Sequence, residues 1–251
     1  MELEVKLSEI LDSLFLMYGI ALALLYSCFV ILARKAIKTH RQCSIFLDPK
    51  DMLSAGDLPS VSLLAPAYNE GRTILTNVRS LLSIQYPYLQ LIIINDGSSD
   101  DSMAKLIEAY DLNPIDARFI TEPIPTARVK AVYKSRNPFF GNLTVLDKEN
   151  GGRADALNAG INFATTELVL CTDADCIIEQ DAVLKMVRPI LQESDVEVIA
   201  IGGSIGIVND SEIRNGRLQS LRLPRKLLPR FQVVEYIRAF LLGRMAWSQV
   251  N

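Results

Sequence analysis

The sequence predicts an α/β fold, a mostly parallel sheet with flanking helices, preceded by one N-terminal transmembrane helix. Two observations predict the sheet: short apolar runs alternate with stretches that carry apolar residues at helical spacing, and polar loops follow the runs. One observation predicts the membrane helix. Leu14 to Ala33 carries no charge over about 20 residues, the length that spans the hydrocarbon core of a bilayer.

Length and composition narrow the class of protein. The 251 residues suffice for one α/β domain with additional segments, and a hydrophobic content of 49% is high for a purely soluble protein. The net charge of −3 argues against general nucleic-acid binding. The 4 cysteines show no paired metal-ligand spacing, and the single histidine, His40, is expected at the membrane interface rather than as a ligand.

The charges that flank the apolar run predict its orientation. Acidic residues predominate before the run: Glu2, Glu4, Glu9 and Asp12. Basic residues follow it: Arg34, Lys35, Lys38 and Arg41. The positive-inside rule therefore places the N-terminus outside the inner cell membrane and the chain after Ala33 in the cytoplasm. A cleaved signal peptide is not expected, because no small-residue cleavage site follows the run.

The chain divides into four expected segments. Residues 1–35 are the membrane anchor, and residues 36–59 are a polar juxtamembrane linker with Pro and Gly breakers. Residues 60–208 form the α/β domain. Residues 209–251 are a basic linker followed by an amphipathic helix over Phe231 to Trp247, which lies in the membrane interface or packs on the core.

Two strand–loop–helix repeats open the α/β domain. Val61 to Ala65 reads as a short buried strand closed by Pro66, and Leu91 to Ile94 reads as the second strand. Each is followed by a helix with one apolar stripe. The stripes are Ile74, Val78, Leu81 and Leu82 in the first helix and Met103, Leu106, Ile107 and Tyr110 in the second.

The order of elements continues less regularly. Residues 111–142 contain several prolines and no clear period, with a candidate edge strand over Arg128 to Tyr133 and a further strand over Leu143 to Leu146. Later elements are a helix with Leu157, Ile161 and Ala164 inward, a helix over Asp181 to Leu191 with Val183, Met186, Val187 and Ile190 inward, and a bent strand or strand pair over Val198 to Ile207.

Two carboxylates end the apolar run that begins at Leu168. This run reads as a buried parallel strand, and alternation along it places Asp173 and Asp175 on one side with Ala174 on the other. Ligand sites of open α/β sheets lie beyond the carboxyl ends of the strands, where paired carboxylates suit a hard divalent cation. A solvated Asp pair in a turn is the alternative.

A glycine pair lies between two cations in the run from Lys148 to Arg153. Gly151 and Gly152 free the backbone for a tight turn, and paired glycines alone are ordinary turn formers. Cations beside a helix N-terminus serve phosphate oxygens well, so the flanking charges favour a phosphate ligand.

Four motifs in order resemble the family 2 inverting glycosyltransferases, which bind nucleotide sugars on a GT-A fold. The motifs are Ala65-Pro66-Ala67-Tyr68-Asn69-Glu70, Asn95-Asp96-Gly97-Ser98-Ser99-Asp100, Lys148 to Asn158, and Thr172-Asp173-Ala174-Asp175. The resemblance covers about residues 60–208. The anchor and the run from Gln232 to Tyr236 resemble the membrane-bound branch that builds polysaccharides such as cellulose, hyaluronan or poly-N-acetylglucosamine.

The resemblance implies a nucleotide pocket after the first two strands. Ala67, Tyr68 and Glu70 would line the base and ribose pocket, and Asp96 would accept a hydrogen bond from the uracil of a UDP-sugar. The alternatives without a ligand are packing for Tyr68 and a helix-start charge for Glu70.

The resemblance also implies a diphosphate and metal subsite. Lys148 and Arg153 would face the diphosphate, although a surface cation is the alternative for Lys148. Asp173 would address the ribose and, with Asp175, the Mg²⁺ or Mn²⁺ that bridges the phosphates. The metal would act as a Lewis acid toward the departing nucleoside diphosphate.

Two motifs of the family do not occur in the sequence. Inversion needs a general base to take the proton from the acceptor, in this family the aspartate of a Thr/Glu-Glu-Asp motif. That motif and the Gln-x-x-Arg-Trp motif of the membrane branch are absent, so no catalytic residue is assigned. We therefore expect an incomplete domain, the N-terminal donor-binding part of such an enzyme, from a truncated reading frame or with a second chain that supplies the other half.

Three functions remain open at this point. The first is sugar transfer from a nucleotide sugar to a polysaccharide acceptor at the membrane. The second is transfer of one sugar to a polyprenyl phosphate, a lipid-linked acceptor. The third is a non-catalytic, membrane-tethered nucleotide-binding or scaffolding subunit.

Overall fold

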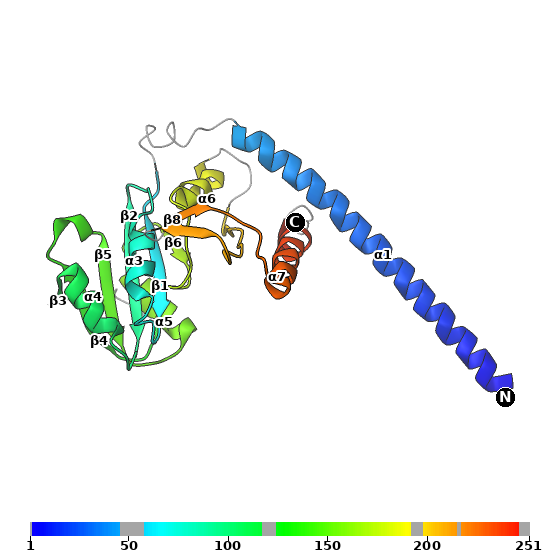
Figure 1. Ribbon diagram of the computed structural model, residues 1–251, viewed down its shortest axis with the longest axis horizontal. Helices are drawn as coiled ribbons and strands as arrows, with labels where there is room; N and C mark the ends of the chain where they lie inside the picture. Colours follow the sequence, from blue (N-terminus) through cyan, green and yellow to red (C-terminus); the bar gives the residue numbers. More distant parts are fainter. Residues whose placement is uncertain (1, 46–57, 117–123, 192–197, 215–216, 246–251) are drawn as a thin grey trace. The chain divides into compact units, whose positions relative to one another are not determined.

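The computed structural model describes residues 2–45, 58–116, 124–191, 198–214 and 217–245 (Figure 1). The chain forms two compact units, and each is described by itself. The first unit comprises residues 1–48, 204–210 and 222–251, and the second comprises residues 49–203 and 211–221.

The second unit is built on a mostly parallel sheet. Its strands among the described residues are β1 (Val61–Ala67), β2 (Leu89–Asp96), β3 (Leu112–Ile115), β4 (Val129–Ser135), β5 (Leu143–Lys148) and β6 (Leu168–Cys171). Their order across the sheet is β3-β4-β5-β2-β1-β6. Strands β5, β2, β1 and β6 are parallel, whereas β4 is antiparallel to both β3 and β5. This arrangement confirms the predicted fold class.

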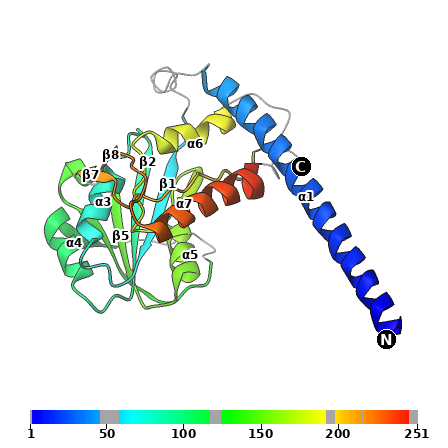
Figure 2. The ribbon, with the colours of Figure 1, turned by 45° about the vertical axis from the view of Figure 1, so that its right-hand side comes forward.

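Helices cover both faces of the sheet. Their bounds are α3 (Ile74–Leu82), α4 (Ser102–Tyr110), α5 (Arg153–Phe163) and α6 (Ala182–Leu191), with a 3₁₀ turn η1 at Pro138–Phe140. On one face Ala156 of α5 joins a core cluster with strand residues Leu64, Ile92, Ile94, Val132 and Leu146. Helices α3 and α4 lie on the other face (Figure 2). Because side chains alternate along a strand, both faces of the central strands are buried.

The first strand is longer than predicted, because Pro66 does not close it. Strand β1 runs to Ala67, and Pro66 pairs in register with Ile94 of β2. The ladder with β6 ends at Leu64, so no strand on that side requires the N–H that proline lacks.

The edge strands differ from the prediction at both ends of the sheet. Strand β4 lies inside the sheet, and the edge is β3, a strand missed because its Pro114 hides the strand pattern. Proline is tolerated there, since the outer side of an edge strand has no ladder to complete. At the other end β6 is an edge strand rather than a buried one, and its Val169 is 43% exposed.

The prediction of a bent strand or strand pair over Val198 to Ile207 is wrong. The described residues 198–208 form no strand, and the Ile199 side chain is 90% exposed. Strand structure requires a partner for the backbone, and the glycine pair Gly202-Gly203 offers no side chain to bury against one. In α6 the buried residues are Val183, Leu184 and Val187; Ile190 is exposed, contrary to prediction.

The predicted basic linker contains regular structure. Residues Glu212–Arg214 (β7) and Arg217–Ser220 (β8) pair as antiparallel strands. In the first unit, α7 (Leu227–Arg238) begins four residues before the predicted helix and continues as a π-helix, η2 (Ala239–Met245). No described residue of α7 is buried within its own unit.

The first unit also contains the long apolar helix α1, Glu2–Ile45. Residues Glu9–Lys38 are long and apolar enough to cross a membrane, and none of the 18-residue apolar window within them is buried inside the molecule. The helix continues into the predicted linker, because no breaker precedes Pro49. Within this unit α1 contacts η2.

Candidate functional site

The parallel strands bring four loops to one edge of the sheet. The carboxyl ends of β5, β2, β1 and β6 are neighbours in that order, so the loops that follow them also lie side by side. Every residue that the sequence singled out as a binding residue lies at this edge. The edge is therefore the candidate site, as the general rule for open α/β sheets expects.

The loops after β1 and β2 are joined by side-chain hydrogen bonds. The Asn69 backbone N–H donates to Ser98 Oγ (2.9 Å), and Asn69 Oδ1 accepts from the Ser99 N–H (2.8 Å). The Gly71 N–H donates to Asp100 Oδ2 (2.8 Å). Asn69 adopts a left-handed backbone with φ of 55°, which asparagine tolerates better than most residues. The two loops therefore hold each other in one conformation.

Asp100 anchors this junction. Its Oδ1 accepts from the Ser102 hydroxyl (2.5 Å) and the Ser102 N–H (3.0 Å). The hydrogen bond from the Ser102 hydroxyl lowers the pKa of the Asp100 carboxyl. Burial acts in the opposite direction, but the N–H groups of Gly71 and Ser102 lower this pKa further. The positive charge of Lys105 nearby also lowers this pKa.

The expected base and ribose residues lie at the end of β1. Ala67 is buried as the last strand residue, and the Tyr68 side chain is 54% exposed. Glu70 Oε2 accepts from Thr73 Oγ1 (2.7 Å). A hollow of about 530 Å³ lies beside them, lined by Asn69, Glu70, Gly71, Arg72, Thr73, Asp100, Asp101 and Lys105.

A buried charge cluster joins the ends of β2 and β5. Lys148 Nζ lies 2.7 Å from Asp96 Oδ1 and 2.5 Å from Asp155 Oδ1. The Lys148 side chain is fully buried, and that of Asp96 is 5% exposed. Lys148 thus lies beneath the surface of the site rather than as the exposed cation that the sequence suggested. Burial alone would lower the pKa of Lys148, but its bonds to Asp155 and Asp96 raise it above the ordinary value.

Asp96 also fixes the glycine turn. The Gly151 N–H donates to Asp96 Oδ1 (3.0 Å) and the Gly152 N–H donates to Asp96 Oδ2 (2.8 Å). Gly152 has a φ of 86°, a conformation that side chains disfavour. A Cβ on Gly151 would overlap the Asp155 carboxylate. The glycine pair therefore allows a close backbone approach to the buried Asp96 carboxylate and the partly exposed Asp155 carboxylate.

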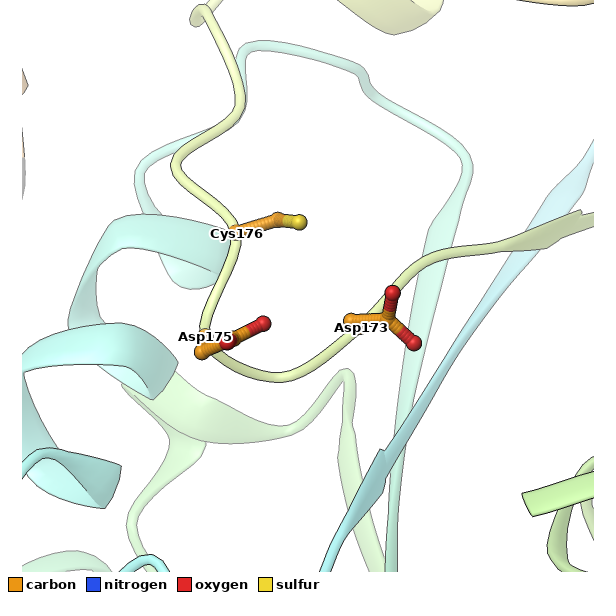
Figure 3. A group of neighbouring side chains, drawn as sticks. All are labelled: Asp173, Asp175 and Cys176. Carbon is orange, nitrogen blue, oxygen red and sulfur yellow. The ribbon is translucent and has the colours of Figure 1, made fainter. Parts of the chain in front are cut away.

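The two aspartates after β6 meet through a turn. Strand β6 ends at Cys171, and the Cys176 N–H donates to the Asp173 carbonyl (3.1 Å), which closes a turn around Ala174 and Asp175. The predicted strand alternation is therefore replaced by a turn, although Ala174 does point inward and is buried. Figure 3 shows both carboxylates and the Cys176 thiol on this turn. One potential ligand atom from each of the three residues lies within 4.8 Å of the other two.

The donor set of this turn suits a hard divalent cation. Asp173 and Asp175 are exposed carboxylates, the oxygen ligands that Mg²⁺ and Mn²⁺ prefer. The third atom of the group is the Cys176 sulfur, a soft ligand. The two carboxylates therefore fit the expected metal, and the thiol is not needed for it.

Arg153 links the glycine turn to the aspartates. Its Nε lies 2.6 Å from Asp173 Oδ1, and both side chains are half exposed. The first residue of α5 thus reaches the turn after β6, as the shared edge of the sheet predicts.

Two members of this arrangement carried no predicted role. Asp155 lies in the first turn of α5 and completes the cluster with Lys148; an acidic residue in a first turn could have indicated it. Cys176 follows Asp175 directly in the sequence, but the spacing of the cysteines does not indicate a metal ligand there. Only the turn geometry brings its sulfur beside the two carboxylates.

Comparison with solved structures gives distant likenesses. The mannosyltransferase PcManGT from Pyrobaculum calidifontis, solved with GDP-Man and Mn²⁺, aligns at 20% identity with a TM-score of 0.42 over 65% of this chain and 44% of that chain. TarS 1-349 from S. aureus, solved with UDP-GlcNAc, aligns at 20% identity with a TM-score of 0.36 over 50% of this chain and 29% of that one.

Comparison by sequence gives closer relatives. The poly-beta-1,6-N-acetyl-D-glucosamine synthase of Staphylococcus aureus (strain COL) is 31% identical over 182 residues, which cover 72% of this chain and 37% of that protein. The synthase of the same name from Staphylococcus epidermidis is 33% identical over 162 residues, 64% of this chain and 32% of that protein. This chain thus spans well under half the length of these relatives.

A family model decides the assignment. The model for glycosyl transferase family 2 matches residues 62–247, which include all four motifs and all four loops of the site. The relatives are polysaccharide synthases, as the predicted branch of the family requires. The chain belongs to glycosyl transferase family 2.

Proposed function

We propose that this chain binds a UDP-sugar, with N-acetylglucosamine as the sugar, at the carboxyl edge of its sheet. It forms the donor-binding part of a membrane glycosyltransferase that extends a polysaccharide with inversion at the sugar carbon. One observation carries the proposal: the family match covers four loops that converge on the exposed Asp173 and Asp175 pair. The sugar follows from the poly-N-acetylglucosamine synthases among the sequence relatives.

The residues of the site divide into a nucleoside side and a diphosphate side. On the nucleoside side, Tyr68 is exposed for stacking, and Ala67, Glu70 and Asp96 lie at the ends of the neighbouring strands β1 and β2. An aromatic ring is a suitable surface for a nucleobase, because every base has a π-face.

On the diphosphate side, Arg153 offers a guanidinium that matches phosphate oxygens. Asp173 and Asp175 would hold Mg²⁺ or Mn²⁺, which supplies charge neutralisation for the leaving diphosphate. Arg153 and the two aspartates come from neighbouring loops, so they can orient the diphosphate together. We assign no general base within this chain.

The membrane location follows from α1. Its apolar stretch is long enough to cross a bilayer, and basic residues follow it. We propose that α1 anchors the chain in the cell membrane with the N-terminus outside and the sheet domain in the cytoplasm. A cytoplasmic sheet domain would have direct access to nucleotide sugars and would deliver the sugar to an acceptor at the membrane.

Metal-dependent binding of UDP tests the proposal. The purified full chain in detergent is titrated with UDP by calorimetry, with Mn²⁺ and with EDTA. We expect binding that requires Mn²⁺ and is lost in Asp175→Ala. The control is Asp181→Ala, which removes a carboxylate six residues further on that lies outside the metal group.

Three outcomes separate the functions. Metal-dependent binding followed by transfer from UDP-N-acetylglucosamine supports the polysaccharide function. Binding without transfer to any sugar or polyprenyl-phosphate acceptor favours a nucleotide-binding subunit. A wild-type chain that binds no UDP contradicts the proposal.

A further inference from the structure

We propose that Lys148 is a positioning residue of the donor site. Its buried ammonium holds the Asp96 carboxylate and the Gly151–Gly152 turn in the arrangement that receives the donor, and it makes no contact with the diphosphate. This inference rests on the proposed function, because it concerns the same edge of the sheet.

The first step concerns the hydrogens of the ammonium group. A lysine ammonium has three N–H donors. Lys148 Nζ has three close acceptors: Asp96 Oδ1 at 2.7 Å, Asp155 Oδ1 at 2.5 Å and the Glu149 carbonyl at 2.6 Å. The side chain has no exposed surface. A diphosphate oxygen would have to displace one of these acceptors, so Lys148 acts through its partners.

The second step concerns what the partners hold. Asp96 receives both N–H groups of the glycine turn, and this turn leads directly into Arg153 at the start of α5. Asp155 receives the Ala127 N–H (2.8 Å), which ties the segment before β4 to the first turn of α5. One ammonium therefore joins the ends of β2 and β5 to the helix that carries Arg153.

The third step concerns charge. Two carboxylates share one ammonium, so the cluster carries one excess negative charge, offset by the backbone N–H groups that point at it. Removing Lys148 would leave the buried Asp96 carboxylate and the partly exposed Asp155 carboxylate without a counterion, which is destabilising. Changing Asp155 to asparagine instead leaves a neutral Asp96–Lys148 pair. Asp155→Asn is therefore the variant that loosens the cluster without leaving an unpaired charge.

The test compares Asp155→Asn with the wild type. The full chain in detergent is titrated with UDP in the presence of Mn²⁺ by calorimetry, at a temperature well below the unfolding temperature of each variant. We expect the affinity for UDP to fall about tenfold, the effect of misplacing one charge-assisted hydrogen bond. The fall is expected even though a negative charge has been removed beside an anionic ligand.

A direct contact between Lys148 and the diphosphate predicts the opposite change in UDP affinity. If Lys148 contacted the diphosphate directly, Asp155→Asn would free its ammonium and raise the affinity. An affinity that rises or stays unchanged therefore overturns the proposal. A purely structural role would lower the unfolding temperature and leave the affinity of the folded chain unchanged, which also overturns it.

Two further variants complete the design. Lys148→Arg keeps the charge and the donors, so we expect it to retain more UDP affinity than Lys148→Met. The matched control is Lys185→Met: Lys185 also has two carboxylate partners, Glu179 and Asp181 at 2.9 Å each, but it is 55% exposed on α6. We expect this control to bind UDP like the wild type. A wild type that fails to bind UDP would contradict the proposed function and not the role of Lys148.

Discussion

Arg153 and Asp173 form an ion pair, with Nε and Oδ1 2.6 Å apart, between the start of α5 and the turn after β6. The carboxylate proposed to hold a metal is thus already held by a cation of the protein. Under the proposed function, Arg153 and a divalent ion would compete for the same oxygen until a diphosphate offered the guanidinium a new partner. The pair is half exposed, so its own contribution to holding Asp173 is expected to be small.

Arg153→Gln should therefore change two affinities in opposite directions. We expect the affinity for Mn²⁺ alone to rise about two- to fivefold, since exposed ion pairs contribute up to about 1 kcal/mol. The affinity for UDP with Mn²⁺ should fall about tenfold, because a charge-assisted contact to the diphosphate is lost. Calorimetry measures both, and the exposed Arg136→Gln serves as the control. Two affinities that fall together would contradict the competition.

The junction of the first two loops depends on Asp100 rather than on its neighbour Asp101. Asp100→Ala removes the acceptor of the Gly71 and Ser102 N–H groups, and we expect the free energy of unfolding to fall by about 1–2 kcal/mol. Asp101→Ala breaks only a surface pair with Lys105, worth about 0.5 kcal/mol or less. Urea denaturation measures both variants. If Asp100→Ala lost no more free energy of unfolding than Asp101→Ala, the hydrogen bonds of this junction would not contribute to stability.

Two glycines should differ in their tolerance of alanine. Gly152→Ala meets no neighbouring atom but has a φ of 86°, so strain alone should reduce the free energy of unfolding by about 1 kcal/mol. Gly97→Ala, with a φ of 70°, would also meet the Asn150 backbone nitrogen at 2.6 Å and should cost more.

Gly206→Ala is the control for these glycines. Its added Cβ meets no atom within 4 Å and its φ is not in the left-handed region, so stability should not fall. Denaturant unfolding of the three variants gives the order. A Gly97→Ala variant that is as stable as the wild type would contradict the close approach of the glycine turn to the end of β2.

The charge cluster predicts how stability responds to acid. Burial alone would raise the pKa of Asp155, but Lys148 and the Ala127 N–H lower it below its ordinary value. A carboxyl whose pKa is lowered by folding stabilises the fold above its unfolded pKa. That contribution is lost as pH falls below about 4 and through the lower folded pKa.

Unfolding measured between pH 6 and pH 2 tests this prediction. We expect the free energy of unfolding of the wild type to fall more steeply below pH 4 than that of Asp155→Asn, which has no carboxyl to protonate at this position. Asp181→Asn, at a 42% exposed carboxylate just before α6, should follow the wild-type curve. Identical curves for wild type and Asp155→Asn would show that the cluster does not contribute.

The sequence identified the central strands and their loops correctly because both signals are local. Buried runs such as Leu91 to Ile94 are apolar regardless of their neighbours, and each is followed by a polar loop. Prediction from the sequence was wrong at the edges of the sheet. Strand β3 contains Pro114, and the apolar run from Val198 has no partner strand among the described residues, so their states depend on what lies beside them.

By itself the sequence determined the family, the parallel sheet, the long apolar N-terminal helix and the edge at which the four motifs meet. It could do so because periodicity and motif order are properties of the chain alone. The tertiary structure decided that Lys148 is buried between Asp96 and Asp155, and that a turn rather than a strand brings Asp173 and Asp175 together. These outcomes required residues far apart in the chain to meet, because burial and ion pairing are properties of neighbours in space.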